Sequence, residues 1–481
     1  MDKFIETVES VNAAVNDVVW GVPMLVLLLG VGIYLSFGTK FFQITKFGYA
    51  LKNTIFAVFK GKDATQSKDR NAISQFQALA TALAATVGTG NIVGVATAIA
   101  AGGAGAIFWM WVSAFFGMMT KYAEIVLGIY FRRRNGNGEW VGGPMYYIEK
   151  GLGQKWLAVL FAVFCLFASF GIGSIAQVNG ISTAMESSFH VPKLLTGVVV
   201  CALVAIIVLG GIQRIATVTE KFVPFMAIVY VVGALAVIAA NYKNIFPALS
   251  EIFAGAFHLK SIGGGVVGYG IARAMRYGFA RGVFSNEAGL GSSVLVHTCA
   301  DVDEPVKQGL WGIFEVFFDT VVICSLTAFA ILTTGAHRVA GLEGVNVTMH
   351  AFESVFGKAG SYAVSVGIVL FAFSTLLGWS VYGCRVAEYL GGQKFKTVYK
   401  FLFLAVVLIG SVSGVQLVWD VSDTFNGLMA LPNLIGVLLL SPLVFRITKN
   451  YRERVFLHKS VKPMLSFYEQ QKQKNRRMKN G

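Results

Sequence analysis

Long apolar blocks separated by short polar connections dominate the pattern along this chain. The segments 22–37, 194–211 and 222–240, for example, contain no charged residue. An α-helix rises about 1.5 Å per residue, so roughly 20 apolar residues cross the hydrocarbon of a bilayer. The pattern predicts an all-α polytopic membrane protein with about 11 transmembrane helices. The predicted spans cover residues 18–37, 75–101, 105–132, 155–186, 194–211, 217–240, 266–297, 308–334, 361–389, 398–415 and 418–446.

Two further stretches are predicted to be helices lying on the membrane surface. Residues 41–60 mix lysines with aromatic side chains, and residues 245–257 form a second such segment. The N-terminus lacks the basic start and small-residue cleavage site of a signal peptide, so we expect the first span to be retained. We divide the chain into an N-terminal span with a cytoplasmic amphipathic linker (1–74), a ten-helix transporter core (75–446) and a basic cytoplasmic tail (447–481).

The basic residues are distributed unevenly between the two sides of the predicted bundle. The chain has 40 Lys and Arg against 25 Asp and Glu, a formal net charge of +15. If the N-terminus lies outside, the inner connections carry 30 of the basic residues and the outer connections carry six. Cytoplasmic loops are enriched in Lys and Arg, so we expect a plasma-membrane protein with a cytoplasmic C-terminus. The basic residues would then set the orientation of the chain in the membrane and contact anionic lipid, and we predict no nucleic-acid partner.

The sequence contains no pattern typical of an enzyme or an ATP-driven pump. The five cysteines show no CxxC spacing, and the six histidines show no HExxH or similar metal-ligand spacing. The GTGN segment at 88–91 lacks the lysine and the spacing of a phosphate-binding loop. We therefore predict no catalytic residues.

Two of the predicted spans are interrupted by glycine and polar residues at their centres. With the first span set aside, they are the first and sixth of ten helices, interrupted at 86–91 (TVGTGN) and 283–291 (VFSNEAGLG). Discontinuous helices at matching positions of two halves indicate a secondary transporter built from a repeat. Because each half has an odd number of helices, the second half enters the membrane from the opposite side, which makes the repeat inverted.

An interrupted helix exposes backbone groups that suit a small charged solute. The N-terminal end of a half-helix presents free N–H groups and a positive dipole end to a carboxylate, and the other half ends in free carbonyls. Gly88 and Gly90 allow a ligand to reach the main chain, and Asn91 adds an oxygen suited to a small cation. The alternative is helix packing, because Gly88, Gly90 and Gly94 can seat a neighbouring helix.

The segments GTGNIVGVATAIAAGG, FWMWVSAFFGMMTKYAE, GGPMYYI and FSNEAGLGSS resemble the alanine/glycine:cation symporter family of bacterial sodium:amino-acid carriers. The resemblance covers nearly the whole chain, and the motif pattern shows no departure from the family. It implies a LeuT-type fold with a five-plus-five inverted repeat and one extra N-terminal span. It also implies alternating access and the coupled movement of a small neutral amino acid and sodium.

The resemblance implies one substrate site and two sodium sites around the breaks. The amides of Thr89 and Gly90 would hold the substrate carboxylate, and backbone carbonyls would receive its ammonium group. The implied substrate-binding residues are Thr86, Thr89, Gly90, Gln177, Phe284, Ser285 and Trp379. The implied ligands of the first sodium site are Thr86, Asn91, Ser285 and Asn286. The implied ligands of the second are Ala84, Val87, Phe371, Ser374 and Thr375.

Several of these residues also have a plain structural interpretation. Ser374 and Thr375 face one side of a helix with Phe371, but hydroxyls in membrane helices commonly bond back to carbonyls of the preceding turn. Spacing alone favours that structural interpretation, and only the resemblance favours an ion site. Trp379 and Phe284 are equally explained by core packing.

Acidic residues inside predicted spans are expensive and often functional. We expect Glu287 to cap the half-helix that follows the second break, and Lys121 to pair with Glu124 three residues later. Glu315 and Asp319 lie one helical turn apart. They suggest either a proton or ion relay or, as we expect, a hydrogen-bonded structural role. Arg281, close to the second break, receives no role from the sequence.

The predicted function is a secondary active symporter that imports a small neutral amino acid with sodium, most simply as a monomer. Alanine or glycine is the expected substrate, and glutamine is a further candidate. A proton-coupled amino-acid carrier is the main alternative. An ion channel would need a repeated filter of carbonyls or charge rings along a pore, and the sequence has no such repeat.

Overall fold

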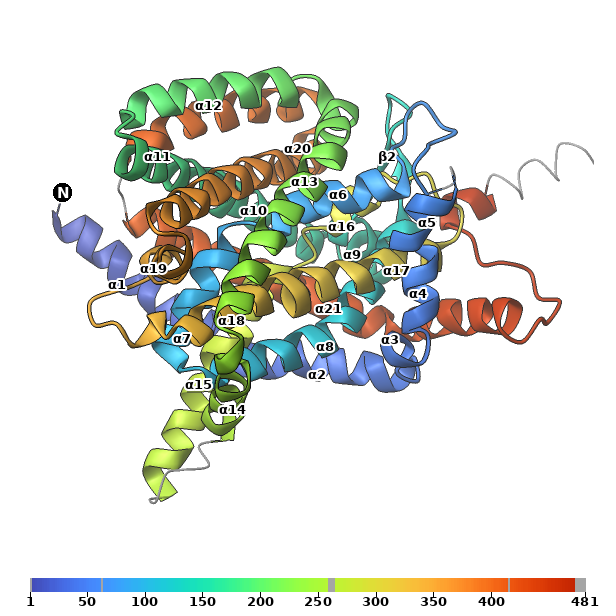
Figure 1. The fold of residues 1–481 in the computed structure, drawn as a ribbon. Helices are drawn as coiled ribbons and strands as arrows, with labels where there is room; N and C mark the ends of the chain where they lie inside the picture. The colour runs from blue at the N-terminus through green and yellow to red at the C-terminus, as the bar shows by residue number, and fades with distance from the viewer. Residues whose placement is uncertain (1, 62–63, 258–263, 414–415, 472–481) are drawn as a thin grey trace, which may run out of the picture.

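A computed structural model describes residues 2–61, 64–257, 264–413 and 416–471, and it is a bundle of helices (Figure 1). The chain begins with five helices that precede the predicted core. They are α1 (Asp2–Val19), α2 (Val22–Gly38), α3 (Phe42–Thr45), α4 (Phe47–Asn53) and α5 (Ile55–Lys60). The last three confirm the predicted helical character of residues 41–60.

The first half of the core contains the first broken helix and a small β-hairpin. Its helices are α6 (Gln75–Thr86), the π-helix η1 (Gly90–Gly94), α7 (Val95–Gly102), α8 (Gly105–Phe131), α9 (Pro144–Leu152), α10 (Lys155–Phe170), η2 (Gly171–Ile175), α11 (Ala176–Phe189), α12 (Lys193–Val208), α13 (Gly211–Ala240), η3 (Tyr242–Asn244) and α14 (Ile245–Phe257). The antiparallel strands β1 (Arg133–Arg134) and β2 (Trp140–Val141) form the hairpin between α8 and α9.

The second half contains the second broken helix and a long bent helix. Its elements are α15 (Gly264–Asn286), α16 (Val294–His297), α17 (Pro305–Val316), the π-helix η4 (Phe317–Cys324), α18 (Ser325–Thr334), η5 (Ala336–Arg338), α19 (Val345–Phe356), α20 (Lys358–Val412) and α21 (Gln416–Val455). The predicted core and tail boundary at 446/447 falls inside α21.

The predicted number of spans is not confirmed, although the all-α polytopic class is. Seven helices of the described residues are long and apolar enough to cross a membrane, or eight if the bent pair around the first break counts as one span. The difference has identifiable causes. Helix α12 has only 16 residues. Helix α20 contains two of the predicted spans and turns between them at Gly392, whose φ of 71° favours glycine.

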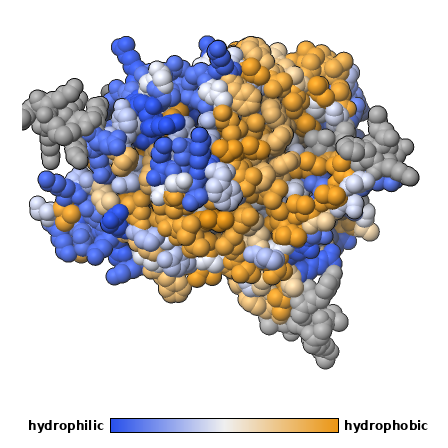
Figure 2. Space-filling model, turned by 180° about the vertical axis from the view of Figure 1, so that it is seen from behind, coloured by the Kyte–Doolittle hydropathy of each residue, from blue (hydrophilic) through white to orange (hydrophobic). Residues whose placement is uncertain are grey.

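The surface matches a chain that sits in a bilayer. Figure 2 shows hydrophilic residues gathered at one end of the molecule and a broad hydrophobic area beside them. Large apolar side chains such as Val22, Phe225 and Phe246 are exposed. Connections that the charge pattern assigns to the inner side lie together, because Arg134 pairs with Asp69 and Ile73 pairs with Ala300.

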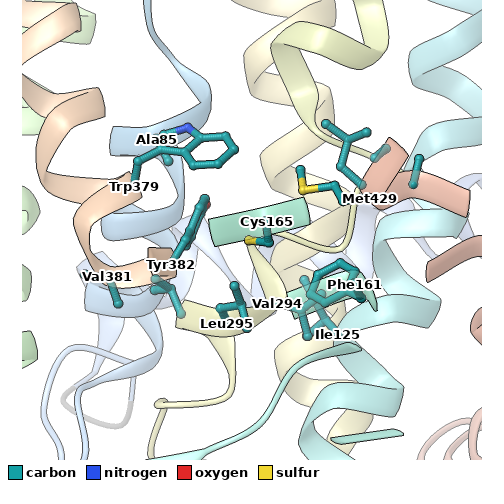
Figure 3. Packing of buried hydrophobic residues seen from close by; sticks show 14 of the residues in the cluster. Ala85, Ile125, Phe161, Cys165, Val294, Leu295, Trp379, Val381, Tyr382 and Met429 are labelled. Carbon is teal, nitrogen blue, oxygen red and sulfur yellow. The ribbon is translucent and has the colours of Figure 1, made fainter. Parts of the chain in front are cut away.

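The core around the first break is tightly packed. Helix α6 begins with a capping box, in which Ser74 and Gln77 bond each other's backbone N–H groups. Figure 3 shows Trp379 of α20 next to Ala85 of α6, with Tyr382 close by. At Gly378 an added Cβ would lie 2.7 Å from the Ala85 backbone nitrogen, so only glycine lets α20 approach α6 this closely. The packing fixes the position of the helix end that follows Ala85.

Candidate functional site

The first break separates α6 from η1 by three residues, Val87 to Thr89, of which Val87 and Gly88 are not helical. The two parts of the broken helix meet at an angle of 53°. An added Cβ on Gly88 would lie 2.6 Å from the Thr375 hydroxyl oxygen, so the backbone there directly faces α20. By contrast, an added Cβ on Gly94 meets nothing within 4 Å, so Gly94 does not seat a neighbouring helix. The helix-packing alternative therefore fails at one of its three glycines.

The second break follows α15 and lies directly opposite the first. The backbone leaves the helix at Glu287, with a φ of 55°, and continues through Gly289 and Gly291, which also have positive φ. An added Cβ on Gly90 would lie 3.4 Å from the Phe284 ring, which is ordinary contact. The two interrupted helices therefore face each other across the centre of the bundle.

A small pocket of about 20 Å³ lies between the two breaks. Six of the seven predicted substrate residues line it: Thr86, Thr89, Gly90, Gln177, Phe284 and Trp379. The seventh, Ser285, does not line it, because its side chain turns toward Asp319. The structure thus brings together residues from α6, η1, α11, α15 and α20 that are far apart in the sequence.

Two further polar residues of this pocket had no predicted role in substrate binding. Asn426 of α21 lines it, is 2% exposed, and its side-chain oxygen has no partner among the described residues. Glu287 also lines the pocket and accepts a hydrogen bond from Ser292 at 2.5 Å, rather than capping a helix as predicted. Asn426 was missed because a single asparagine in an apolar helix carries no spacing signal.

A larger cavity of about 780 Å³ adjoins the small pocket. Thr89, Gly90, Ile172 and Phe284 line both spaces, so these residues form the boundary between them. The cavity extends past His190 and Glu353 at the ends of α11 and α19. It therefore runs toward the end of the bundle that carries the N-terminus (Figure 1).

Arg281, which had no role in the sequence analysis, lines this larger cavity. Its guanidinium lies over the Phe284 ring, 5.7 Å from the ring centroid. Asp420 and Asp423 of α21 line the same cavity. The arginine is therefore placed beside the aromatic ring that separates the cavity from the pocket.

The opposite end of the bundle is held by an ion network. Arg385 of α20 pairs with Glu139 of the β-hairpin connection at 3.0 Å and with Glu388 at 3.1 Å, and Lys396 contacts the same two acids. Burial alone would raise the pKa of Glu139, but the charges of Arg385 and Lys396 lower it to about 2. Glu139 is thus ionised at neutral pH, and the network joins the hairpin to α20 at this end.

Asp319 is the centre of a buried polar cluster beside the breaks. The amide nitrogen of Asn91 donates to its Oδ1 at 2.7 Å. The hydroxyls of Ser285 and Thr320 donate to its Oδ2 at 2.8 and 2.9 Å. Among the described residues, no Lys, Arg or His forms an ion pair with this carboxylate, so only neutral groups contact it.

The side chains of Asn91 and Asn286, which were predicted as cation ligands, form hydrogen bonds with other protein groups. Asn91 turns its nitrogen to Asp319 because a carboxylate accepts hydrogen bonds, and its oxygen accepts from the Gly88 amide at 2.9 Å. Asn286 donates to the Thr320 hydroxyl at 3.0 Å. The hydrogen bonds that the sequence analysis expected of Asp319 are present, and two of their donors are Asn91 and Ser285, which were predicted for the first sodium site.

The second predicted ion site is also assembled from buried groups. Ala84, Val87, Phe371, Ser374 and Thr375 are each no more than 4% exposed, and α20 packs against α6 here. The hydroxyls of Ser374 and Thr375 donate to the Phe371 carbonyl at 2.8 and 2.9 Å, as the structural interpretation predicted. A hydroxyl that donates its proton keeps its lone pairs, so the two interpretations are compatible.

Glu315, one turn before Asp319, belongs to a separate ionic cluster. Lys121 pairs with Glu315 at 3.5 Å, and His297 contacts the same carboxylate at 2.8 Å. The predicted pair of Lys121 with Glu124 is wrong, because Glu124 instead accepts from Asn433 at 2.5 Å. Tertiary packing of α8 against α17 decides the partner here, and spacing along one helix does not.

Comparison with known proteins identifies relatives over nearly the whole chain. The model of the sodium:alanine symporter family matches residues 5–465. The sodium/alanine symporter AgcS of Methanococcus maripaludis is 47% identical over 446 residues, which cover 91% of this chain and 96% of AgcS. The probable sodium/glutamine symporter GlnT of Bacillus subtilis is 40% identical over 448 residues, covering 93% of this chain and 91% of GlnT.

A solved structure supports the fold. The crystal structure of MhsT in complex with L-phenylalanine superimposes with a TM-score of 0.54 at 13% sequence identity. The match covers 80% of this chain and 98% of MhsT. The likeness confirms the LeuT-type fold that the family resemblance implied.

Proposed function

The chain belongs to the sodium:alanine symporter family, and from this premise we propose that it imports a small neutral amino acid together with sodium by alternating access. Alanine or glycine is the proposed substrate, with glutamine as a second candidate because GlnT is a relative. One observation carries the proposal: six predicted substrate residues from five separate elements line one pocket between two broken helices.

We propose that the pocket binds the amino acid by its two charged ends. The amides of Thr89 and Gly90 would hold the carboxylate, because unpaired N–H groups at a half-helix start attract an anion. The carbonyls of Thr86, Phe284 and Ser285 would receive the ammonium group. A pocket walled by Trp379 and Phe284 leaves little room for a side chain, which favours alanine or glycine over larger substrates.

Sodium would bind at two places in this proposal. Asp319, with the oxygens of Ser285 and Thr320, forms a carboxylate-centred site, since sodium is a hard cation that prefers oxygen ligands. The Phe371, Ser374 and Thr375 group, together with the Ala84 and Val87 carbonyls, forms a second site from neutral oxygens. A carboxylate without a fixed counter-charge also keeps the proton-coupled alternative open to experiment.

The proposed orientation places the N-terminus outside the cell and the C-terminus in the cytoplasm, in a monomer in the plasma membrane. The large cavity then opens outward, and the Arg385 network closes the inner end. The conformation in the structure would accordingly be one that accepts substrate from outside.

Uptake into proteoliposomes tests the function directly. With labelled alanine, glycine and glutamine, and with sodium and proton gradients imposed separately, we expect saturable alanine or glycine uptake that requires a sodium gradient. Uptake driven equally by a proton gradient without sodium would establish the proton-coupled alternative. A non-saturable flux down its own gradient would establish a channel.

Gly90→Val tests the proposed binding of the substrate carboxylate by the Gly90 amide. The side chain would block the amide, and we expect it to abolish thermal stabilisation by alanine while the ligand-free melting temperature changes little, since bound ligand adds only RT ln(1 + [L]/Kd) to stability. Gly30→Val, at an exposed position of α2 with no atom within 4 Å of the added Cβ, is the matched control. A large drop in ligand-free melting temperature with binding retained would make Gly90 a packing residue.

A further inference from the structure

Glu287 is the only acidic or basic residue in the lining of the small pocket between the two breaks, among the residues that the structure describes. The other polar side chains of the lining, such as Gln177, Thr375 and Asn426, are neutral. The pocket therefore contains one formal charge, and this charge is negative when Glu287 is ionised. No role in binding has so far been given to this carboxylate.

The backbone of the second break holds Glu287 at the wall of the pocket. Its φ of 55° turns the chain out of α15. Its N–H donates to the Val283 carbonyl at 2.8 Å, and its carbonyl accepts from the Leu290 N–H at 3.2 Å. Residues other than glycine rarely adopt a positive φ, and they keep it only where the surrounding structure enforces it. The position of the carboxylate is therefore fixed by main-chain bonds.

One carboxylate oxygen of Glu287 is occupied and the other is free. Oε2 accepts a hydrogen bond from the Ser292 hydroxyl at 2.5 Å, and Oε1 accepts none from the described part of the chain. The nearby Tyr382 hydroxyl donates to no described residue. The unpaired Oε2 of Glu124 is enclosed by protein, whereas Glu287 Oε1 keeps accessible surface at the pocket that Glu287 lines. A group that enters the pocket can thus reach Oε1.

The basic side chains of this region are bound to another acid. Lys121 interacts with Glu287 only at longer range. Its amine donates to Ser293 at 2.6 Å and pairs with Glu315 at 3.5 Å, and His297 contacts the same Glu315 carboxylate. No Lys, Arg or His of the described ranges forms an ion pair with Glu287. Because a buried carboxylate without a counter-charge is unfavourable, the pocket favours an occupant that brings a positive charge.

The size of the pocket suits one small cationic group. Its volume of about 20 Å³ holds a group about as large as a water molecule, and an ammonium group has that size. Thr89 and Gly90, the proposed carboxylate ligands, line the same pocket. We propose that Glu287 Oε1 binds the ammonium group of the substrate and makes the protein specific for a free α-amine. This inference rests on the proposed function, and it supplies the negative charge that the neutral backbone carbonyls lack.

The charge of Glu287 would exclude acids of the same size that lack the amine. Lactate has the carboxylate and the methyl group of alanine, but it has a hydroxyl where alanine has the ammonium group. The hydroxyl can donate a hydrogen bond to Glu287, but it leaves the charge of the buried carboxylate unbalanced. We therefore expect the site to accept alanine and to reject lactate.

Thermal stabilisation of the purified full chain in detergent, at saturating sodium, measures the apparent affinities for alanine and lactate. We expect the wild type to bind alanine about a hundredfold more tightly than lactate, since a hydrogen-bonding site strongly rejects the wrong analogue. Glu287→Gln removes the charge but keeps the size of the side chain and an acceptor for Ser292. It should weaken alanine binding about ten- to a hundredfold without weakening lactate binding, because hydrogen bonds to charged groups are the strong ones.

Glu124→Gln is the matched control. Glu124 is also a buried acid that accepts a hydrogen bond from a neutral side chain, that of Asn433, but it does not line the pocket. This variant should change the melting temperature and leave the ratio of alanine to lactate affinity within about twofold of the wild type, as expected for a distant site.

Each further outcome decides the proposal. A Glu287→Gln variant that binds alanine as the wild type does would overturn it, and so would a wild type that binds lactate as tightly as alanine. If Glu287→Gln does not fold, Glu287→Asp withdraws the charge by one methylene and should weaken alanine more than lactate; equal weakening would overturn the proposal.

Two results separate this inference from its neighbours. If Glu287→Gln raises the half-maximal sodium concentration but keeps the ratio of alanine to lactate affinity, sodium occupies the pocket and the ammonium assignment is wrong. If the wild type neither binds nor takes up alanine, glycine or glutamine, the proposed function itself fails, and the inference fails with it. A neutral Glu287→Gln variant of a wild type that does take up alanine removes the inference alone.

Discussion

Glu315 and Asp319 lie one helical turn apart, and both are fully buried, yet their surroundings are opposite. Glu315 contacts two basic side chains, Lys121 and His297. Asp319 contacts only the neutral donors Asn91, Ser285 and Thr320. A buried carboxylate needs a compensating positive charge, and the protein supplies one for Glu315 only.

The difference separates a structural acid from a proposed binding acid. Because Glu315 has fixed basic partners, it links α17 to α8 and to the segment that follows the second break. Its charge is already balanced, so it does not attract a mobile ion. Asp319 has its hydrogen bonds satisfied but its charge uncompensated, which is the condition for attracting a small cation. Both residues are fully buried carboxylic acids on consecutive helical turns, so the charge of the neighbours is the deciding feature.

The largest expected effect is on stability, from Lys121→Met. It leaves Glu315 with His297 alone, and breaking a buried ion pair by removing one partner costs about 3–5 kcal/mol. We expect a much lower melting temperature in detergent and a smaller folded fraction by size-exclusion chromatography. The double variant Lys121→Met with Glu315→Gln should recover part of the loss, because no unpaired carboxylate remains. A single variant that melts as the wild type does would remove the contrast between the two acids.

The next effect is on ion binding, from Asp319→Asn. We expect the sodium concentration for half-maximal uptake to rise by about ten- to a hundredfold, where each factor of ten equals about 1.4 kcal/mol. The sodium-free melting temperature should change little. The new amide oxygen can accept from Asn91, and its nitrogen can donate to the hydroxyls of Ser285 and Thr320.

Glu315→Gln is the matched comparison for that experiment, on the same helix. It should lower stability and leave the half-maximal sodium concentration within about twofold of the wild type, because Glu315 has its own counter-charges. If the two variants change sodium dependence equally, the acids act as one relay and the distinction between them is wrong.

The sequence predicted the breaks well because broken membrane helices leave a local signal. Glycine and polar residues at 86–91 and 283–291 stand out against apolar surroundings, and their matching positions predicted a transporter built from an inverted repeat. The family resemblance added the LeuT-type fold, which the solved structure supports. The resemblance, and not the local signal, supplied the substrate candidates, and six of the seven meet in one pocket.

The partners of the buried acids were not predictable in this way. The Lys121 and Glu124 spacing suggested a pair within one helix, but the geometry of α8 against α17 gives Lys121 to Glu315. For Glu315 and Asp319 the sequence analysis expected a hydrogen-bonded structural role and named a proton or ion relay as the alternative, because a one-dimensional sequence does not show which of two acids faces a base. The span count is not confirmed, in part because α20 runs through two predicted spans with a non-helical residue, Gly392, between them.

A smaller effect is expected from Asn91→Ala, which removes one neutral donor from Asp319 and one acceptor from the Gly88 amide. We expect about a tenfold higher half-maximal sodium concentration, with a loss of about 1–3 kcal/mol in stability from the unsatisfied groups. Asn433→Ala is the control, since Asn433 also donates to a buried carboxylate, that of Glu124, but lies outside the proposed ion sites. It should lower stability without changing sodium dependence; an equal sodium effect would mean that Asn91 acts only through the fold.

The smallest effect is expected at the second site, from Thr375→Ala. That site contains neutral oxygens only, so the loss of one ligand removes a dipole rather than a charge. We expect sodium binding to weaken by about 1 kcal/mol, which is a fewfold rise in the half-maximal sodium concentration. Thr375→Ser keeps the hydroxyl and its bond to Phe371 and should behave as the wild type. Thr334→Ala removes the same kind of back-bond, to Ala330 at 2.8 Å, away from the site, and should leave sodium dependence unchanged. If Thr334→Ala and Thr375→Ala have the same sodium response, the Thr375 hydroxyl only bonds the Phe371 carbonyl of its own helix and does not bind sodium. Asp319 would then be the single ion site that the comparison with Glu315 supports.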